Sequence, residues 1–600
     1  MTDSFVPRRA RKRRRWPAVT AYAALMAVLA LGAAVAWQIH EYWEALKPGT
    51  ERIEPDFGGN PKPVFHAGTM LEDPAAGSGD GLMLTLETVR QLFDPYLYHE
   101  PSTDSVILTT ADKVVRMKTD QLTAFVNEEP VQLAFPLTVV DDELYVPLAV
   151  LEPYYRFTWI ESGKTGAVLL FREGDVLQWA RVRPAAAAAG IFPGIGTAGA
   201  DAVPDVAALR TAADHKAPIA LDLADGERVL ILDDEGGWYR VQTTDGWIGY
   251  VAKNEAVLEA PEVIRGERRE DPYVPWKPVG GKINLTWEHV VSRNPDTSAI
   301  GDMPGLNVVS PTWFYLADDE GNVGNKASHA YVRWAHERGY QVWALFSNDF
   351  DPDRTRAVLS DYDKRMKVIR QLLHYAETYR LQGINIDFEN VYMEDGPKLT
   401  QFVRELTPWL HEQGLVVSID VTIRGGSPMW SLFLDRRALG ETVDYMAVMT
   451  YDQHWASSPV AGSVAELSWT EKGIADIIRE DGVPPSKLLL GVPFYTYIWT
   501  EEKENGKTKV KSRAVGMTFM NNLIEEKGLV PVFDEKAGQD YVEYEEDGKR
   551  IRVWLENEKS MRARMEIVNK YGLAGVASWR RGLESPDIWT VMKETLEKRP

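Results

Sequence analysis

In the C-terminal half of the chain, apolar residues follow two spacings, one typical of helices and one typical of strands. Apolar positions in 361–381 and in 399–410 recur every three to four residues, which predicts two amphipathic helices. The stretch between them, 382–389, alternates apolar and polar residues, and a further apolar strand at 415–422 follows the second helix. The same succession recurs from about residue 282 onward and predicts a parallel sheet with crossover helices.

This region of roughly 320 residues has room for eight strands, the number that a (β/α)8 TIM barrel of the α/β class requires. We expect the strands near residues 283–287, 306–311, 341–346, 383–389, 416–422, 445–451, 488–493 and 575–579. The interval between the last two strands is too long for one helix, and its alternating charged segments predict a small α+β insertion at about 495–555. We expect the insertion to wall one side of an active-site cleft at the C-terminal ends of the strands.

The 382–389 strand has one polar and one apolar face. Asn385, Asp387 and Glu389 share the polar face, because residues two apart on a strand point the same way. A carboxylate raises the proton affinity of a carboxyl group beside it, so that a Glu can stay protonated near neutral pH and donate to a leaving oxygen. The strand therefore indicates cleavage of glycosidic bonds. The structural alternative is a pair of acids that only decorates a sheet edge.

Motifs with chemical meaning fall at the ends of three predicted strands. The fourth strand reads Gln382-Gly383-x-Asn385-x-Asp387-x-Glu389, the sixth ends in Met449-Thr450-Tyr451-Asp452, and the eighth ends at Trp579. In this order they resemble the Asp-Gly-x-Asp-x-Asp-x-Glu, the Met-x-Tyr-Asp and the terminal Trp of glycoside hydrolase family 18, the chitinase-like barrels. The segments 310–314, 383–391 and 449–455 are most similar to the bacterial spore-cortex and cell-wall N-acetylglucosaminidases of that family.

The resemblance implies a retaining, substrate-assisted reaction, in which the 2-acetamido oxygen of the substrate attacks the anomeric carbon. Glu389 would be the general acid and then the general base. Asp387 would hold and polarise the acetamido N–H group. Tyr451 and Asp452 would hydrogen-bond the acetamido group and the distorted sugar, and Trp579 would stack on the apolar sugar face.

The other candidates for substrate binding are Asn385, Met449, His454, Trp455 and Trp313. Met449 is equally explained by core packing, and His454 and Trp455 either line the cleft or cap a loop. Trp313 lies in the family-like segment of the second strand. At Asn385 the family has an Asp, so the amide predicts a shifted pH profile with the acid retained. A catalytically inactive barrel that still binds sugar is the alternative.

Composition narrows the remaining chemistry. The chain has no Cys, which excludes thiol catalysis, disulfides and Cys-based metal sites. Its ten His form no His-Glu-x-x-His motif, and no Gly-rich phosphate-binding loop occurs. We therefore expect neither a cofactor nor a metal. The net charge of −21 argues against nucleic acid as a partner, but it does not choose between peptidoglycan and chitin.

The N-terminus predicts export. A basic arm at 1–16 precedes an apolar segment, 17–37, that is long enough to span a bilayer. The positive-inside tendency places the arm in the cytoplasm and the bulk of the chain outside a cell membrane. The alternative is a cleaved signal peptide, since Ala34-Val35-Ala36 has small residues at the required spacing.

Two small β-rich domains are expected between this segment and the barrel. Asp112-Lys113-Val114-Val115 and Tyr145-Val146-Pro147-Leu148 resemble the copper amine oxidase N-terminal-like module, and Gly246-Trp247-Ile248-Gly249-Tyr250-Val251 resembles bacterial SH3-like domains. Each is expected to be a spacer or a wall-binding module. The predicted boundaries are a linker at 38–81, the first module at 82–175, an Ala- and Pro-rich linker at 176–206, the SH3-like domain at 207–258, a linker at 259–281 and the barrel at 282–600.

Together these features predict a membrane-anchored glycosidase that faces outward. Its expected partner is an N-acetylglucosamine-containing glycan of the cell wall, with peptidoglycan or spore cortex favoured over chitin. The alternatives are an inactive, wall-binding barrel and a hydrolase of chitin oligosaccharides.

Overall fold

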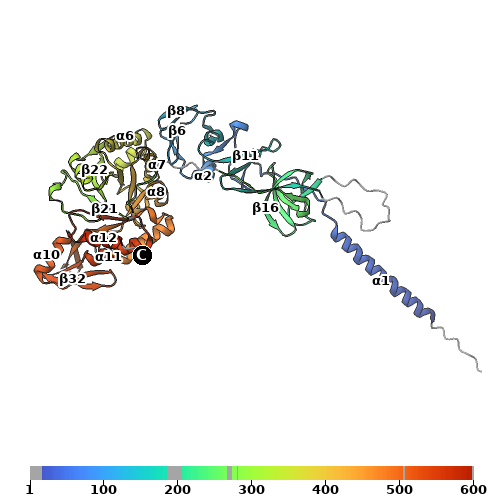
Figure 1. Ribbon diagram of the computed structural model, residues 1–600. Helices are drawn as coiled ribbons and strands as arrows, with labels where there is room; N and C mark the ends of the chain where they lie inside the picture. The colour runs from blue at the N-terminus through green and yellow to red at the C-terminus, as the bar shows by residue number, and fades with distance from the viewer. Residues whose placement is uncertain (1–16, 185–205, 266–272, 280, 505–506, 598–600) are drawn as a thin grey trace, which may run out of the picture. The chain divides into compact units, whose positions relative to one another are not determined.

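The computed structural model describes residues 17–184, 206–265, 273–279, 281–504 and 507–597 (Figure 1). The chain divides into two compact units, one of Met1–Thr88 with Pro147–Glu267 and one of Val89–Val146 with Arg268–Pro600. The predicted basic arm at 1–16 and most of the predicted linker at 176–206 lie outside the described residues.

Helix α1 (Pro17–Leu46) is the apolar segment that the N-terminus predicts (Figure 1). Its 25-residue part Tyr22–Leu46 has a mean hydropathy of 1.8 and exposes its apolar side chains. At 1.5 Å per residue this part is about 38 Å long, more than the ~30 Å hydrocarbon core of a bilayer. The structure confirms an N-terminal apolar helix, which fits a membrane anchor and a signal peptide alike.

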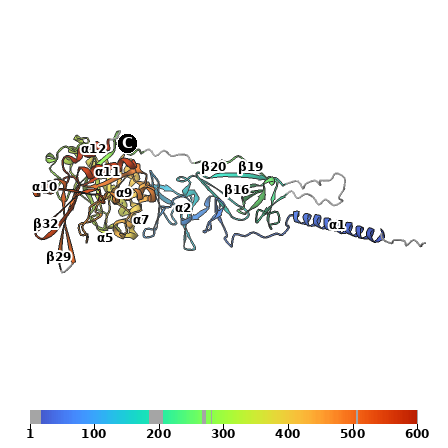
Figure 2. The same ribbon diagram turned by 90° about the horizontal axis from the view of Figure 1, so that it is seen from below.

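The first unit is rich in β-structure, as predicted. Its larger sheet runs in the order β15-β14-β18-β17-β16-β13-β19, and its smaller sheet in the order β11-β12-β1-β2. The strands are β1 (Val64–His66), β2 (Thr69–Met70), β11 (Phe157–Glu161), β12 (Val168–Arg172), β13 (Val176–Val182), β14 (Val206–Arg210), β15 (Ile219–Ala224), β16 (Arg228–Glu235), β17 (Trp238–Thr243), β18 (Ile248–Ala252) and β19 (Ala256–Leu258). The unit also contains β3 (Met83–Thr85), α3 (Leu148–Leu151) and β20 (Glu262–Val263), which pairs with β13 (Figure 2).

Strand β13 occupies the start of the segment that we expected to be a linker. Its Leu177, Trp179 and Val182 are buried, and Trp179 packs with Phe65 and Leu230 in a core that the two sheets share. This burial gives Val176–Val182 the free energy to form a strand in place of a free linker.

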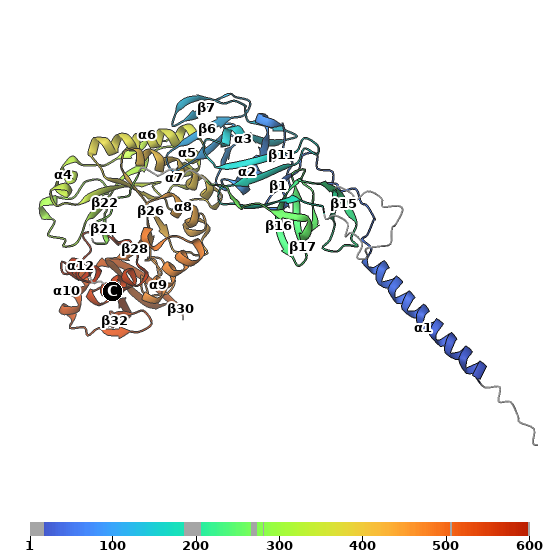
Figure 3. The ribbon, with the colours of Figure 1, turned by 45° about the vertical axis from the view of Figure 1, so that its right-hand side comes forward.

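The second unit begins with a small antiparallel sheet that packs on the barrel. Its strands are β4 (Tyr98–Glu100), β5 (Ser105–Thr109), β6 (Val114–Lys118), β7 (Thr123–Val126) and β8 (Glu129–Gln132). Strands β9 (Thr138–Val140) and β10 (Glu143–Pro147) pair with each other in a different sheet. Helix α2 (Leu86–Leu92) crosses the boundary between the units. Strands β6 and β7 lie beside α6 (Tyr362–Tyr379) of the barrel (Figure 3).

A buried arginine ties this sheet to the barrel. Arg365 on α6 is fully buried and contacts Glu100 of β4 at 2.6 Å and Glu405 of the barrel at 2.8 Å. Near the surface, Arg116 of β6 pairs with Asp363 at 2.9 Å. Removing either carboxylate would leave the buried guanidinium without its full charge compensation, so these ion pairs hold the small sheet on the barrel. The residues expected to form one module at 82–175 are therefore not one compact unit, since 89–146 belong to the unit of the barrel.

The barrel is a closed sheet of eight parallel strands, which confirms the predicted fold class. The strands are β21 (Ile283–Glu288), β22 (Val308–Leu316), β24 (Gln341–Ser347), β25 (Gly383–Asp387), β26 (Val416–Thr422), β27 (Tyr445–Met449), β28 (Leu488–Pro493) and β34 (Gly575–Trp579). Strand β21 pairs with both β22 and β34 and so closes the sheet. A short antiparallel strand, β23 (Val323–Asn325), extends β22.

Helices and one insertion surround these strands (Figures 1 and 3). The helices are α4 (His329–Glu337), α5 (Pro352–Leu359), α6, α7 (Gly396–Glu412), α8 (Arg436–Thr442), α9 (Leu467–Asp476), α11 (Glu558–Tyr571) and α12 (Ile588–Leu596). The predicted α+β insertion lies between β28 and α11. It consists of β29 (Tyr495–Glu504), β30 (Lys507–Gly516), α10 (Met517–Lys527), β31 (Val532–Asp534), β32 (Gln539–Glu546) and β33 (Lys549–Trp554).

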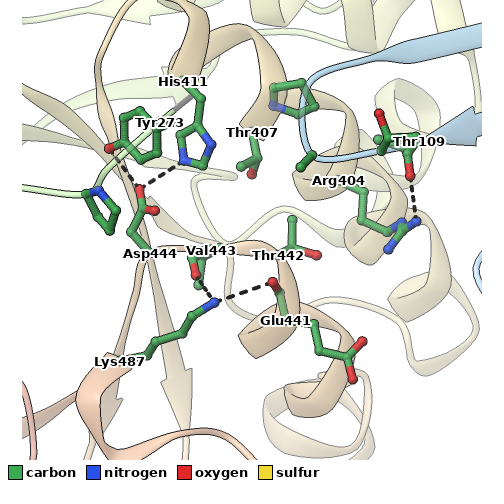
Figure 4. A pocket seen from close by; sticks show the side chains of 14 residues that line it. Thr109, Tyr273, Arg404, Thr407, His411, Glu441, Thr442, Val443, Asp444 and Lys487 are labelled. Carbon is green, nitrogen blue, oxygen red and sulfur yellow. Dashed lines mark hydrogen bonds and ion pairs between the residues drawn. The ribbon is translucent and has the colours of Figure 1, made fainter. Parts of the chain in front are cut away.

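A chain segment before β21 covers the N-terminal end of the barrel. Tyr273 stacks on His411 at 3.6 Å, and both donate to the carboxylate of Asp444 beside a hollow of about 360 Å³ (Figure 4). Trp276 accepts a hydrogen bond from Tyr445 through its carbonyl oxygen, at 2.7 Å. Asp444 directly precedes β27, so this hollow lies at the end of the strands opposite to their carboxyl ends.

Candidate active site

A cleft of about 580 Å³ opens at the carboxyl ends of the barrel strands, where active sites of this fold lie. Strands β24 to β27 and the turns that follow them deliver carboxylates to it. These carboxylates belong to Asp349, Asp387, Glu389, Asp420 and Asp452. Aromatic residues, among them Trp287, Tyr451 and Trp579, complete the lining together with Met449.

Strand β25 has the two faces that its sequence predicts. Ile384 and Ile386 are fully buried against the surrounding helices, while Asn385 and Asp387 point into the barrel. The register pairs Asn385 with Ser418 and Ile386 with Ile419 of β26. Continued by one residue, this register places Asp387 beside Asp420 on the neighbouring strand.

Asn385 lies under the cleft and connects three strands. Its Oδ1 accepts hydrogen bonds from Trp287 Nε1 at 2.9 Å and from Ser310 Oγ at 3.1 Å. Its Nδ2 donates to Asp420 Oδ1 at 2.9 Å. An amide can accept and donate at the same time, which an ionised carboxylate cannot do. Asn385 therefore makes three hydrogen bonds, two accepted and one donated, that connect Trp287, Ser310 and Asp420.

Asp387 and Asp420 are two acids in a desolvated site. Burial raises the pKa of Asp387 to about 7. Burial, followed by the charges of Asp387 and Glu389, raises the pKa of Asp420 well above its ordinary value, against the hydrogen bond from Asn385. Like charges this close share protons, so the site retains protons near neutral pH. Asp387 Oδ1 is buried and has no hydrogen-bond partner among the described residues.

Glu389 lies just past the end of β25 on a fixed backbone. Its N–H donates to Asn348 Oδ1 at 3.0 Å, and its carbonyl accepts from Asn348 Nδ2 at 2.8 Å. Burial, then the charges of Asp387 and Asp452, raise the pKa of Glu389 well above its ordinary value. A carboxyl group in such an environment stays protonated at neutral pH and can act as a general acid.

The insertion completes the site through Asp452. This residue follows β27 with a left-handed backbone, at φ 57°. Its Oδ1 accepts hydrogen bonds from the hydroxyls of Tyr495, at 2.7 Å, and Tyr497, at 3.1 Å, both on β29. Desolvation raises the pKa of Asp452 and the two phenols lower it. Tyr451 beside it is desolvated and surrounded by carboxylates, which raise its pKa well above the usual range, so its hydroxyl is a proton donor.

Trp579 ends β34 at the floor of the cleft. Its ring lies 6.0 Å from that of Trp287 and 5.9 Å from that of His289. The indole is partly exposed to the cleft, which is the arrangement that an aromatic ring needs to stack on a sugar face.

The family model for glycosyl hydrolases family 18 matches residues 315–584 of this chain, from the end of β22 to just past β34. The barrel is a family 18 glycosyl hydrolase domain. Its chemistry makes this chain a glycosidase. Two further models match the first half of the chain, the copper amine oxidase N-terminal domain at 68–170 and the bacterial dipeptidyl-peptidase Sh3 domain at 209–255.

Relatives with known names and solved structures match part of this chain. An uncharacterised glycosylase of Bacillus subtilis, YvbX, is 26% identical over 48% of this chain and 84% of its own length. The cortical fragment-lytic enzyme of Bacillus subtilis is 25% identical over 42% of this chain, and the match spans 58% of that enzyme. The crystal structure of a chitinase from Chromobacterium violaceum has 24% identity and a TM-score of 0.47, and the match covers 53% of this chain and 100% of that one.

The family 18 domain brings most of the sequence-predicted residues together. Asp387, Glu389, Met449, Tyr451, Asp452 and Trp579 line the cleft, and Asn385 lies beneath it. Three predicted binding residues are placed elsewhere.

Trp313 faces away from the cleft. It is fully buried, donates through Nε1 to Asn294 at 2.7 Å and packs on Tyr331 of α4. Its neighbours Thr312 and Phe314 line the cleft in its place, because alternate residues of β22 face opposite sides.

His454 and Trp455 belong to the loop that follows β27 and do not line the cleft. The ring of His454 lies beneath Gly462, with Nδ1 2.8 Å from the carbonyl oxygen of Ser463. The indole of Trp455 is exposed and donates to Ser457. Both residues therefore shape a loop, and neither is among the residues that line the cleft.

Sequence reasoning missed Asp420 and the two tyrosines that hold Asp452. The alternation of Ser418, Asp420 and Thr422 in β26 is the local signal that could have identified Asp420 as an inward-facing acid. Tyr495 and Tyr497 show a similar alternation at the start of the insertion, but only the fold brings them to β27. Within the described ranges, no group of three or more His, Asp or Glu side chains is arranged to hold a metal ion.

Proposed function

We propose that this chain hydrolyses an N-acetylglucosamine-containing glycan of the bacterial cell wall, peptidoglycan or spore cortex, by a retaining, substrate-assisted mechanism. The observation that carries the proposal is a cleft that holds both Glu389, whose pKa burial raises well above its ordinary value, and a buried oxygen of Asp387 with no hydrogen-bond partner among the described residues. Glu389 supplies a proton to the leaving oxygen, and the Asp387 oxygen accepts a hydrogen bond from the acetamido N–H.

In this mechanism the substrate provides its own nucleophile. The acetamido oxygen attacks the anomeric carbon while Glu389 protonates the glycosidic oxygen, and Glu389 then activates the water that opens the oxazolinium ion. Asp387 accepts the acetamido N–H and stabilises that cation. Tyr451 donates to the acetamido oxygen, Asp452 orients the distorted sugar, and Trp579 stacks on its apolar face.

In this scheme Asp387 shares a proton with a second buried acid, Asp420. The family motif has an Asp where this chain has Asn385, which hydrogen-bonds Trp287 and Asp420. Asp420 then takes the part of the second acid beside Asp387, because it is buried next to it on β26. The site keeps a second carboxyl group for proton sharing, supplied by a different strand.

The location of the reaction follows from α1. We place the N-terminal arm, 1–16, in the cytoplasm, the membrane anchor at 17–37, and the two β-rich regions and the barrel outside the membrane. The apolar helix of suitable length, uncharged over 17–37, and the basic arm before it support this orientation. The β-rich regions serve as spacers or as wall-binding modules.

Hydrolysis by the full chain in detergent micelles tests the proposal. Peptidoglycan sacculi, cortex fragments and chitin oligomers are incubated with the protein, and new reducing ends are counted. We expect release from peptidoglycan or cortex, reduced about 10²- to 10⁴-fold in Glu389→Gln. The matched control is Glu412→Gln, an exposed acid at the end of α7, which should leave release unchanged.

Each other result has a defined meaning. Cleavage confined to chitin oligomers would redirect the proposal to chitin. Binding without cleavage by any of the proteins would identify an inactive, wall-binding barrel. Full activity in Glu389→Gln would remove Glu389 from its role as the general acid.

A further inference from the structure

Lys326 is an unusual residue in the acidic cleft. Among the described residues that line the cleft, it is the only Lys or Arg. It follows β23, on the wall formed by the ends of β21 and β22, with Nζ 3.5 Å from the carbonyl oxygen of Val290 and 4.8 Å from the ring centroid of Tyr315. No described carboxylate lies within ion-pair distance of its ammonium group.

Two more basic residues lie near Lys326, His289 in the cleft lining and Arg580 outside it. Arg580 directly follows Trp579, is half-buried and has no ion pair among the described residues. His289 lies 5.9 Å from the ring of Trp579. Burial, then the charges of Arg580 and Lys326, lower the pKa of His289, which places both cations near its ring. We call Lys326, His289 and Arg580 the basic wall.

The charge balance of the cleft makes this wall informative. Arg581, the next residue along, is paired with Glu288, which shows that a cation at this end of the barrel can obtain a carboxylate. Lys326 and Arg580 form no ion pair with a described carboxylate, although the chain has a net charge of −21. Lys326 in the cleft, with Arg580 near it outside the lining, is available to an anion that arrives with the ligand.

The opposite side of the cleft has a different character. Phe350, after β24, is 52% exposed and Trp430, after β26, is 44% exposed, with their ring centroids 6.3 Å apart. Both line the cleft, so they offer apolar ring faces to a sugar. A glycan bound across Trp579 therefore meets an aromatic wall on one side and the basic wall on the other.

We propose that the basic wall binds a carboxylate borne by a sugar adjacent to the one that is cleaved, as on the 3-O-lactyl ether of alternate amino sugars in peptidoglycan. Chitin, a neutral polymer, has no such group. The inference rests on the proposed glycosidase function and names its substrate class. The carboxylate is either the free lactyl group or an acid of the peptide attached to it.

Three tetrasaccharides that share one alternating amino-sugar backbone test the proposal. The first carries free lactyl carboxylates, the second carries the neutral lactyl methylamide, and the third carries an alanyl-glutamate peptide on the lactyl group. The full chain in detergent micelles is assayed for kcat/KM on each. We expect the wild type to prefer at least one acidic substrate over the methylamide by about tenfold, which corresponds to ~1.4 kcal/mol.

Variants assign this preference to the basic wall. Lys326→Gln and Arg580→Gln should each reduce the ratio of acidic to neutral kcat/KM by about threefold or more, while Lys326→Arg should retain most of it. Lys367→Gln is the matched control, because Lys367 also donates to a backbone carbonyl, that of Glu320, but lies outside the cleft. Its ratio should equal that of the wild type.

The outcomes separate the two proposals. A preference for the first substrate assigns the wall to the lactyl carboxylate, and a preference for the third alone assigns it to the peptide. Equal ratios in the wild type and Lys326→Gln, with all three substrates cleaved, would overturn the basic wall and leave the glycosidase intact. No cleavage of any substrate would overturn the proposed function itself.

Discussion

Replacing Asp420 by Asn separates the charge of this residue from its shape. Asp420 is 3% exposed and accepts the hydrogen bond of Asn385 Nδ2 at 2.9 Å. An Asn side chain has the same size and keeps a carbonyl oxygen for that bond, but it has no proton to titrate. The variant therefore tests whether Asp420 is held as an acid in the buried site.

The magnitude follows from the β25–β26 register, which places Asp420 beside Asp387. Neighbouring strands lie about 4.8 Å apart, so two charges there at about 5 Å, in an effective dielectric of ~20, repel by about 3 kcal/mol. Because the folded pKa of Asp420 lies above its unfolded value, the wild type loses stability as the pH rises from about 4 towards the folded pKa. The variant escapes this loss. For a unit of roughly 390 residues, a gain of about 3 kcal/mol raises Tm by about 4 °C.

Calorimetry of the full chain at pH 4.5, 6.0 and 7.5 measures this effect in the barrel transition. Asp420→Asn should match the wild type near pH 4.5 and exceed it at pH 7.5. Asp476→Asn is a control, because a hydrogen bond from Lys472 lowers the pKa of Asp476 below its ordinary value. Its stabilising effect is already present above about pH 4, so its loss should lower Tm by nearly the same amount at all three pH values. A Tm difference for Asp420→Asn that is constant or shrinks with rising pH would refute the reasoning.

Three further variants probe the same site. Asn385→Asp places a second carboxyl group, with a raised folded pKa, against Asp420. The variant should become less stable than the wild type progressively as the pH rises from 4 to 7.5, by about 1–3 kcal/mol in the free energy of unfolding. A stability difference that does not change across that range counts against this reasoning. Tyr497→Phe removes one of the two phenol groups that lower the pKa of Asp452. The acidic limb of the pH profile of kcat/KM should therefore move to higher pH by about one unit. An acidic limb that stays in place contradicts the role of Asp452 as an anion. Trp579→Ala should lower kcat/KM by about tenfold or more at a temperature well below Tm, and an unaltered kcat/KM would show that no sugar stacks there.

Local pattern was enough to predict the barrel and one strand of its site. The alternation in 382–389 placed Asn385, Asp387 and Glu389 on one face, and the cleft contains the two acids as expected. Such patterns are readable because side-chain direction within a strand depends only on neighbours in the sequence. The same rule also explains the place of Trp313, since Thr312 and Phe314 on either side of it face the cleft.

Partners from distant parts of the chain were not readable in this way. Asp420 lies beside Asp387 because two strands pair in a particular register. The local alternation shows that Asp420 points into the barrel, but it does not show that Asp387 is its neighbour. Tyr495 and Tyr497 reach Asp452 because the insertion folds back over β27.

The accessory strands illustrate the same limit at the level of domains. Their sequence resembles one module, yet the buried ion pair between Glu100 and Arg365 joins part of that module to the barrel. The sequence by itself thus determined most of the elements, the fold class and the two carboxylates that β25 brings to the cleft, because each depends on local spacing. The tertiary structure decided which acids lie close enough to share protons, which cation lines the cleft and which segments pack together. These features depend on closure of the sheet and on burial, and residues from distant parts of the chain contribute to both.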